Sequence, residues 1–148
     1  LVMSGRVVIA VGGGGVPVVI NSRGLYEGVE AVIDKDYASS LLAREVGAEL
    51  FIILTSISRV YYHYGRPDQR ALPVITVGEA KKLLEQGEFP PGSMGPKIRA
   101  AIEYIEAGGK EVLITSASHL KSALINRSGT RIVHGIPASS KLDIGGEL

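Results

Sequence analysis

Two continuous apolar runs and a third predicted strand limit the folds open to this chain. The runs span residues 7–11 and 50–54, and the third strand spans residues 111–115. Such runs are typical of strands buried on both faces, as in parallel sheets. Stretches with helical apolar spacing, residues 38–46 and 98–105, lie between them. Strands that alternate with helices predict an α/β fold with a largely parallel sheet covered by helices on both faces.

Cap signals set the limits of the predicted helices. Asp34 or Asp36 is the expected N-cap of the helix through residues 38–46, and Gly47 is expected to end it. Thr76 or Gly78 is expected to begin another short helix. The first helix would bury an apolar face made of Ala38, Leu41, Leu42 and Val46.

Composition excludes several classes of site. The 148 residues contain no cysteine, which excludes disulfides, thiolate metal ligands and a cysteine nucleophile. The net charge of +1 argues against a large nucleic-acid surface, and no apolar run approaches the ~20 residues of a membrane span. We therefore expect a soluble, cytoplasmic protein that binds neither nucleic acid nor membrane.

A run of four glycines directly follows the first apolar run. Gly12, Gly13, Gly14 and Gly15 could present successive backbone N–H groups to the oxygens of a phosphate or carboxylate. No Gly-Lys-Ser/Thr follows, and Pro17 stands where a dinucleotide-binding helix would have to start. The run therefore predicts an anion-binding loop of another kind, with a flexible or tight turn as the alternative.

Two lysines lie where predicted helices begin. Lys35 is flanked by Asp34 and Asp36, and Lys97 follows Pro96 in the first turn of the helix through residue 105. A cation in the first turn opposes the helix dipole, which favours the presence of an anion nearby. Together with the glycine run, the lysines suggest phosphoryl transfer by charge stabilisation. Helix capping and solvated surface lysines are the alternative interpretation.

Aromatic residues and histidines carry a weaker signal. Tyr61, Tyr62 and Tyr64 form a small aromatic group that could pack against an adenine, and ordinary half-buried tyrosines are the alternative. The three histidines are scattered along the chain without the spacing of a zinc site.

In combination, these motifs resemble the carbamate kinase family. They read GGGGVPV at residues 12–18, GVEAVIDKD at residues 28–36 and GSMGPK at residues 92–97, and the resemblance covers roughly residues 5–133. It implies the amino acid kinase fold, a three-layer α/β/α sandwich with a mainly parallel sheet. It also implies reversible phosphoryl transfer between carbamoyl phosphate and ADP to give ATP, with Mg²⁺ accompanying the nucleotide.

The resemblance also implies roles for individual residues. Lys35 would contact phosphate, Asp36 would organise the catalytic lysines, and Lys97 would contact the phosphates of the nucleotide. The remaining residues that the resemblance assigns to the nucleotide or phosphate site are Tyr61, Met94, Gly95 and Pro96.

The resemblance extends over only the C-terminal half of a carbamate kinase. Residues 1–134 are expected to form that nucleotide-binding half, and residues 135–148 a loose tail rich in glycine and serine. Alone, such a half would turn over poorly. It would also expose apolar surface, so we expect a homo-oligomer or a separate N-terminal half as partner.

One motif departs from the family pattern. Residues 55–59 read Thr-Ser-Ile-Ser-Arg where the family usually has Thr-Asp-Val-x-Gly, so an acidic residue and a glycine are replaced by Ser56 and Arg59. This departure favours an alternative function, a non-catalytic nucleotide-binding remnant or regulatory module of the same fold.

Overall fold

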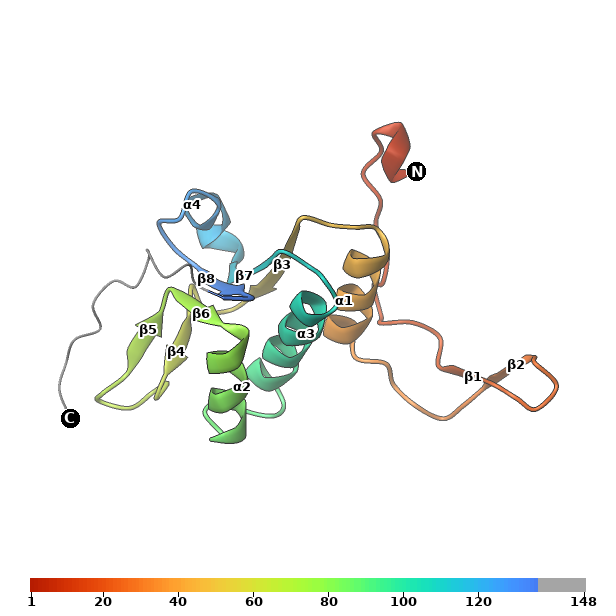
Figure 1. The fold of residues 1–148 in the computed structure, drawn as a ribbon, viewed down its shortest axis with the longest axis horizontal. Coiled ribbons are helices and arrows are strands. Elements are labelled where there is room, and N and C mark those ends of the chain that lie inside the picture. The colour runs from red at the N-terminus through yellow and green to blue at the C-terminus, as the bar shows by residue number, and fades with distance from the viewer. Residues whose placement is uncertain (136–148) are drawn as a thin grey trace.

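A computed structural model describes residues 1–135, and its main element is a four-stranded mixed sheet (Figure 1). The strand order is β3-β7-β8-β6. β7 is parallel to β3 and antiparallel to β8, and β8 is parallel to β6. The sheet is therefore only partly parallel. These strands are β3 (Leu50–Thr55), β6 (Val74–Thr76), β7 (Glu111–Ser116) and β8 (Thr130–Val133).

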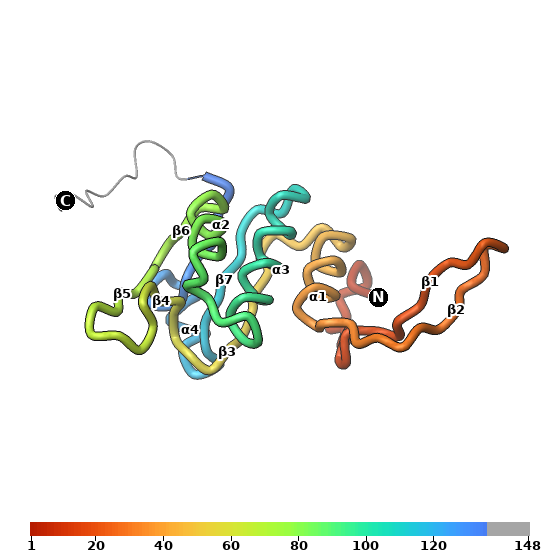
Figure 2. Tube along the Cα trace, turned by 90° about the horizontal axis from the view of Figure 1, so that it is seen from below, coloured from red at the N-terminus to blue at the C-terminus, as the bar shows by residue number. Residues whose placement is uncertain are grey.

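Two antiparallel hairpins lie outside this sheet. β1 (Val18–Ile20) pairs with β2 (Tyr26–Gly28), and β4 (Val60–Tyr62) pairs with β5 (Arg70–Leu72). The β1–β2 hairpin extends away from the rest of the chain in both views (Figures 1 and 2).

Helices cover both faces of the sheet. The described helices are α1 (Lys35–Glu45), α2 (Val77–Glu85), α3 (Met94–Glu106) and α4 (Leu120–Leu124), with 3-10 turns η1 (Val2–Ser4) and η2 (Ala117–His119). Val112 and Ile114 of β7 belong to the core cluster that contains Ile98 of α3. Between them in sequence, Leu113 is fully buried and points to the other face, which α4 covers (Figure 1). The three-layer α/β/α arrangement is thus confirmed.

The caps of α1 are those that the sequence predicts. Asp34 is the N-cap, and its side chain accepts a hydrogen bond of 2.7 Å from the backbone N–H of Asp36. Gly47 adopts a left-handed φ of 64° just beyond the end of the helix, a conformation that glycine favours.

The buried face of α1 differs from the prediction. Leu41, Leu42 and Val46 are exposed. The buried residues are Asp36, Ser40 and Ala43, and the main packing partner of α1 is α3. Small and polar side chains suit this close approach, and Ser40 Oγ donates to the Ala100 carbonyl at 2.9 Å. The predicted apolar face, including the partly buried Ala38, was therefore wrong.

α2 begins with a capping box at Thr76. The Glu79 N–H donates to Thr76 Oγ1 at 3.2 Å, and the Thr76 N–H donates to Glu79 Oε2 at 2.7 Å. Thr76, rather than Gly78, is therefore the N-cap of this helix.

Loss of this cap has a predictable cost. Thr76→Ala is expected to lower the free energy of unfolding by about 1 kcal/mol, because an N–H at the start of α2 loses its acceptor. Thr76→Ser keeps the hydroxyl and is expected to stay close to wild type. Urea unfolding of the two variants checks this, and equal midpoints for alanine and serine would contradict it.

Both apolar runs, residues 7–11 and 50–54, behave differently from the prediction. Residues 7–11 form no strand, and Val7 and Ile9 are 96% and 97% exposed. Within the described residues, no strand pairs with this run, so its backbone and side chains gain nothing from an extended ladder. β3 is a strand as predicted, but it lies at an edge, so only Phe51 and Ile53 are buried.

The predicted tail at residues 135–148 lies outside the described residues, apart from Gly135. In the part of the chain that the structure describes, no helix has the length and apolarity needed to cross a membrane.

Candidate functional site

A cleft of about 160 Å³ lies between the carboxyl end of β3 and the start of α3. Open α/β sheets bind ligands at the carboxyl ends of their strands, which makes this cleft the candidate site. Its walls come from three segments: the end of β3, the β4–β5 hairpin, and the loop from α2 into α3. The lining residues are Thr55, Ser56, Ile57, Val60, Tyr61, Tyr64, Glu88, Phe89, Pro90, Ser93, Met94 and Lys97.

An ion pair joins α1 to α3 beside this cleft. Lys97 Nζ donates to Asp36 Oδ2 at 2.8 Å, and the two side chains are only 14% and 11% exposed. An unpaired charge at such depth would be costly, so each group makes the burial of the other tolerable. The structure therefore brings together two of the three residues predicted to be catalytic, although they lie 61 positions apart.

The third predicted catalytic residue has a different setting. Lys35 is the first residue of α1 and is exposed. Its predicted contact with phosphate stays a prediction.

The loop into α3 is shaped by Gly95. The Gly95 N–H donates to the Pro90 carbonyl at 2.9 Å, and a Cβ at Gly95 would lie 3.1 Å from that carbonyl oxygen. Glycine thus lets the first turn of α3 lie against the loop. Met94 and Lys97 line the cleft, whereas Gly95 and Pro96 shape the turn beneath it.

The tyrosine group divides between two environments. The rings of Tyr61 and Tyr64 lie 5.8 Å apart between centroids, and both residues line the cleft. Tyr62 points elsewhere and stacks on His63, with ring centroids 3.8 Å apart. Tyr61 and Tyr64, here called the tyrosine wall, offer an apolar face to a planar ligand.

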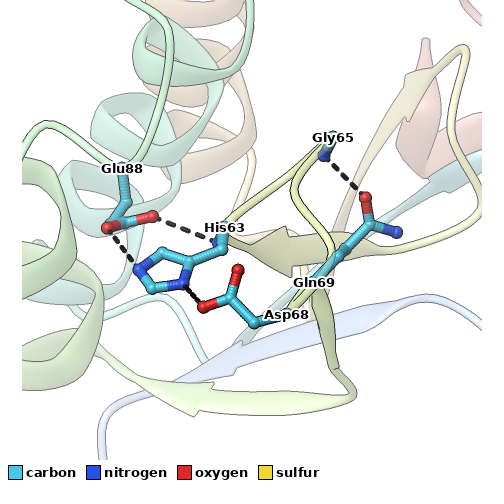
Figure 3. Close-up of polar contacts among 5 residues, drawn as sticks. All are labelled: His63, Gly65, Asp68, Gln69 and Glu88. Atoms are coloured by element: carbon cyan, nitrogen blue, oxygen red, sulfur yellow. Dashed lines mark hydrogen bonds and ion pairs between the residues drawn. The ribbon is translucent and has the colours of Figure 1, made fainter.

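Sequence reasoning missed a polar cluster at the rim of the cleft (Figure 3). His63 Nδ1 contacts Asp68 Oδ2, and His63 Nε2 lies 3.4 Å from Glu88 Oε1. Glu88 Oε2 also accepts the backbone N–H of His63 at 3.2 Å. The hydrogen bond from His63 holds the pKa of Asp68 below its usual value. No short motif links these residues, because Glu88 lies 25 positions beyond His63.

The glycine run lies outside the cleft lining. Gly12 to Gly15 form a turn in which the Gly14 N–H donates to the Val11 carbonyl at 3.2 Å. Gly14 has a φ of 96°, and a Cβ there would lie 2.2 Å from the carbonyl oxygen of Ile33. The run therefore packs against the segment before α1, and its role in anion binding stays a prediction.

The two residues that depart from the family motif differ in position. Ser56 lines the cleft. The guanidinium of Arg59 is turned toward the loop after α4, where Nη2 donates to the Arg127 carbonyl at 3.1 Å. The added bulk of Arg59 is thus taken up away from the lining residues.

Comparison with known proteins gives a consistent picture. A family model described as the amino acid kinase family matches residues 1–116. The carbamate kinase of Thermoplasma acidophilum is 50% identical over 133 residues, which are 90% of this chain and 43% of that protein. The carbamate kinase-like protein YahI of Escherichia coli is 46% identical over 133 residues, or 90% and 42%. The chain thus spans less than half the length of these relatives.

Solved structures agree with this comparison. The carbamate kinase of Giardia lamblia bound to AMP-PNP superposes with a TM-score of 0.78 at 44% identity, over 83% of this chain and 43% of that one. A crystal structure from Aeropyrum pernix gives a TM-score of 0.76 at 48% identity, over 83% and 39%.

Proposed function

The chain belongs to the amino acid kinase family, and from that premise we propose that it is the nucleotide-binding half of a carbamate kinase-like phosphotransferase. Residues 1–134 would correspond to the C-terminal half of the longer relatives. The order of the Lys35–Asp36 and Gly92–Lys97 motifs supports this assignment, as does the AMP-PNP reported with the related Giardia enzyme.

The observation that carries the proposal is the buried Asp36–Lys97 pair beside a cleft with an aromatic wall. A lysine held by a carboxylate has its ammonium fixed in direction and is ready to receive a phosphoryl oxygen. The tyrosine wall would accommodate the adenine ring, and Lys97 would contact the phosphates. Phosphoryl transfer depends chiefly on such positioning and positive charge.

In the proposed reaction, the bond between phosphorus and the carbamoyl oxygen breaks. A new bond forms between that phosphorus and an oxygen of the β-phosphate of ADP, which leaves carbamate and ATP. Lys35, at the start of α1, would stabilise the transferred group together with Lys97.

Magnesium would come with the nucleotide. The described residues contain no group of three or more carboxylate or histidine side chains that could hold a metal ion. Mg²⁺ is often bound through substrate phosphates and one or two carboxylates. Asp36, which pairs with Lys97, would be a carboxylate available to the ion, and Mg²⁺ would neutralise phosphate charge there.

We also propose that the 148-residue chain turns over little by itself. The carbamoyl phosphate side of the site would need residues from an N-terminal half, or from another copy of the chain. Removal of one oriented charge from a transition state already costs about 3 kcal/mol, so the loss of several groups would suppress the reaction.

A second candidate function is nucleotide binding without catalysis. The end of β3 presents Thr55, Ser56 and Ile57 to the cleft without a carboxylate, which favours this alternative. The chain would then act as a regulatory or remnant module of the same fold.

One pair of measurements separates the two functions. ADP binding is measured by calorimetry, and ATP formation from carbamoyl phosphate and ADP by a coupled assay, both on the 148-residue chain. Binding with weak turnover supports the half-site proposal, particularly if added N-terminal half of a relative restores activity. ADP binding without ATP formation, even after this addition, favours the non-catalytic module. Robust turnover by the chain alone would refute the half-site argument, and absence of ADP binding would contradict both functions.

A further inference from the structure

The bridge from Glu88 through His63 to Asp68, here called the histidine bridge, has no part in the proposed reaction (Figure 3). His63 follows β4 and opens the turn toward β5. It adopts a φ of 51°, a left-handed conformation that is uncommon outside glycine, though less so for histidine than for most residues. Such a conformation persists where surrounding contacts hold it in place, and three contacts converge on this residue.

The number of protons on the ring follows from its partners. Both imidazole nitrogens face carboxylate oxygens, Nδ1 toward Asp68 and Nε2 toward Glu88. An ionised carboxylate only accepts hydrogen bonds, and a neutral imidazole carries a single N–H. His63 Nδ1 makes a hydrogen bond with Asp68, whereas Nε2 and Glu88 form an ion pair at 3.4 Å. Only the imidazolium form carries the positive charge and the second N–H that attract both carboxylates.

The bridge connects two walls of the cleft. Glu88 lines the cleft from the loop between α2 and α3, and its second oxygen holds the backbone of His63. Tyr61 and Tyr64 lie on either side of His63 in sequence and form the tyrosine wall. A change at His63 therefore acts on the spacing between this wall and the α2–α3 loop.

We propose that His63 is a positioning residue whose protonated ring clamps the tyrosine wall against the α2–α3 loop, so that the cleft binds nucleotide more weakly once the ring loses its proton. The inference rests on the proposed function, since nucleotide is the ligand. Loss of one proton leaves a ring nitrogen lone pair facing a carboxylate, which releases one side of the clamp.

Two arginines lie near the histidine bridge. Arg66, in the same turn, acts on Asp68 and helps to keep it ionised. Tyr62 stacks on the His63 ring, and the Arg70 guanidinium lies 5.7 Å from the centroid of Tyr62. Both arginines stay charged at all relevant pH values, so they contribute no charge change of their own.

The test compares ADP affinity at about pH 6 and about pH 8, the range in which histidine ordinarily changes charge. His63→Asn removes the titrating group while keeping a residue that tolerates the left-handed backbone. His134→Asn is the matched control, because Val133 pairs with Glu111 at the end of the sheet opposite to the cleft. ADP itself titrates in this range. To remove that contribution, the ratio of ADP affinities at the two pH values in wild type is divided by the same ratio in H63N.

Between about pH 6 and about pH 8, the ADP affinity of wild type is expected to fall about fivefold more than that of H63N. A loss of this size corresponds to one charge-assisted contact. H134N is expected to match wild type. Glu88→Gln offers a second variant should H63N fail to fold, and it should show the same loss of pH dependence. Equal ratios for wild type, H63N and E88Q would overturn the proposal.

A ligand-free measurement separates this inference from the proposed function. In an NMR titration, the amide signals of Tyr61 and Glu88 should follow the imidazole signals of His63 in wild type and in H134N. If they do so while ADP fails to bind, the clamp stands and the nucleotide function fails. If the amide signals of Tyr61 and Glu88 do not shift together with the His63 imidazole signals, the clamp is overturned whether or not ADP binds.

Discussion

Replacement of Lys97 by methionine is expected to lower the free energy of unfolding by about 3 kcal/mol, the lower end for a broken buried ion pair. Methionine fills similar space but leaves the Asp36 carboxylate, only 11% exposed, without its cation. The residual exposure of both side chains places the effect at the low end of the range. Urea unfolding monitored by circular dichroism measures it.

Lys81→Met is the matched control for this change. Lys81 pairs with Glu106 at 2.5 Å, but these side chains are 47% and 46% exposed. A surface pair contributes about 0–1 kcal/mol, so this variant should unfold close to wild type. A double variant, Asp36→Asn with Lys97→Met, should recover part of the loss because no charge stays buried. Equal destabilisation by Lys97→Met and Lys81→Met would contradict the buried-pair argument.

The same lysine gives a functional readout. If Lys97 contacts nucleotide phosphate as proposed, Lys97→Met should weaken ADP binding by about 10- to 100-fold, the loss of a charge-assisted hydrogen bond. Adenosine lacks the phosphates, so its affinity should change little. A variant that is less stable but binds ADP as wild type does would assign Lys97 a purely structural role.

Local signals predicted the ends of helices better than they predicted burial. Asp34, Gly47 and Thr76 act within a single helical turn, and the structure has each of them in its expected role. Burial instead depends on what packs against a segment. Residues 7–11 are all apolar, whereas residues 111–115 include Glu111 and Thr115, yet the second stretch forms the inner strand β7 while Val7 and Ile9 of the first are exposed.

Short strands were not predicted, because they too depend on what pairs with them. β6 has three residues, too few for a pattern to stand out, and its place at the edge of the sheet comes from pairing with β8, far along the chain. The antiparallel pairing of β7 with β8 likewise depends on the turn that ends at Gly129. Sequence periodicity alone therefore indicated an α/β fold but could not give the mixed order of the strands.

In the candidate site, too, local sequence indicated some features, whereas others depend on long-range packing. The residue types in the Asp36 and Lys97 loops suggested phosphate chemistry, and only the resemblance to carbamate kinases indicated that these two side chains belong together. Their contact spans 61 positions and depends on the packing of α1 against α3. The histidine bridge had neither a motif nor a resemblance to reveal it, because Glu88 reaches His63 only through the folded α2–α3 loop.

The turn at Gly129 provides the strongest test of the layer that α4 adds to the sheet. Gly129 has a φ of 80°, and a Cβ there would lie 2.6 Å from Leu113 Cδ1 and 3.1 Å from Ala123 Cβ. Gly129→Ala is therefore expected to lower the free energy of unfolding by about 3 kcal/mol, from backbone strain combined with overpacking. Thermal and urea unfolding both measure the loss.

Gly108→Ala separates these two contributions. Gly108 has a similar left-handed φ of 100°, but a Cβ there would meet no atom within 4 Å. This control should lose only about 1 kcal/mol, the cost of a left-handed backbone for alanine. Leu113→Ala creates space next to Gly129, so adding Gly129→Ala to it should cost less than adding the same change to wild type. Independent effects of the two substitutions would mean that the methyl group added at residue 129 does not press on Leu113.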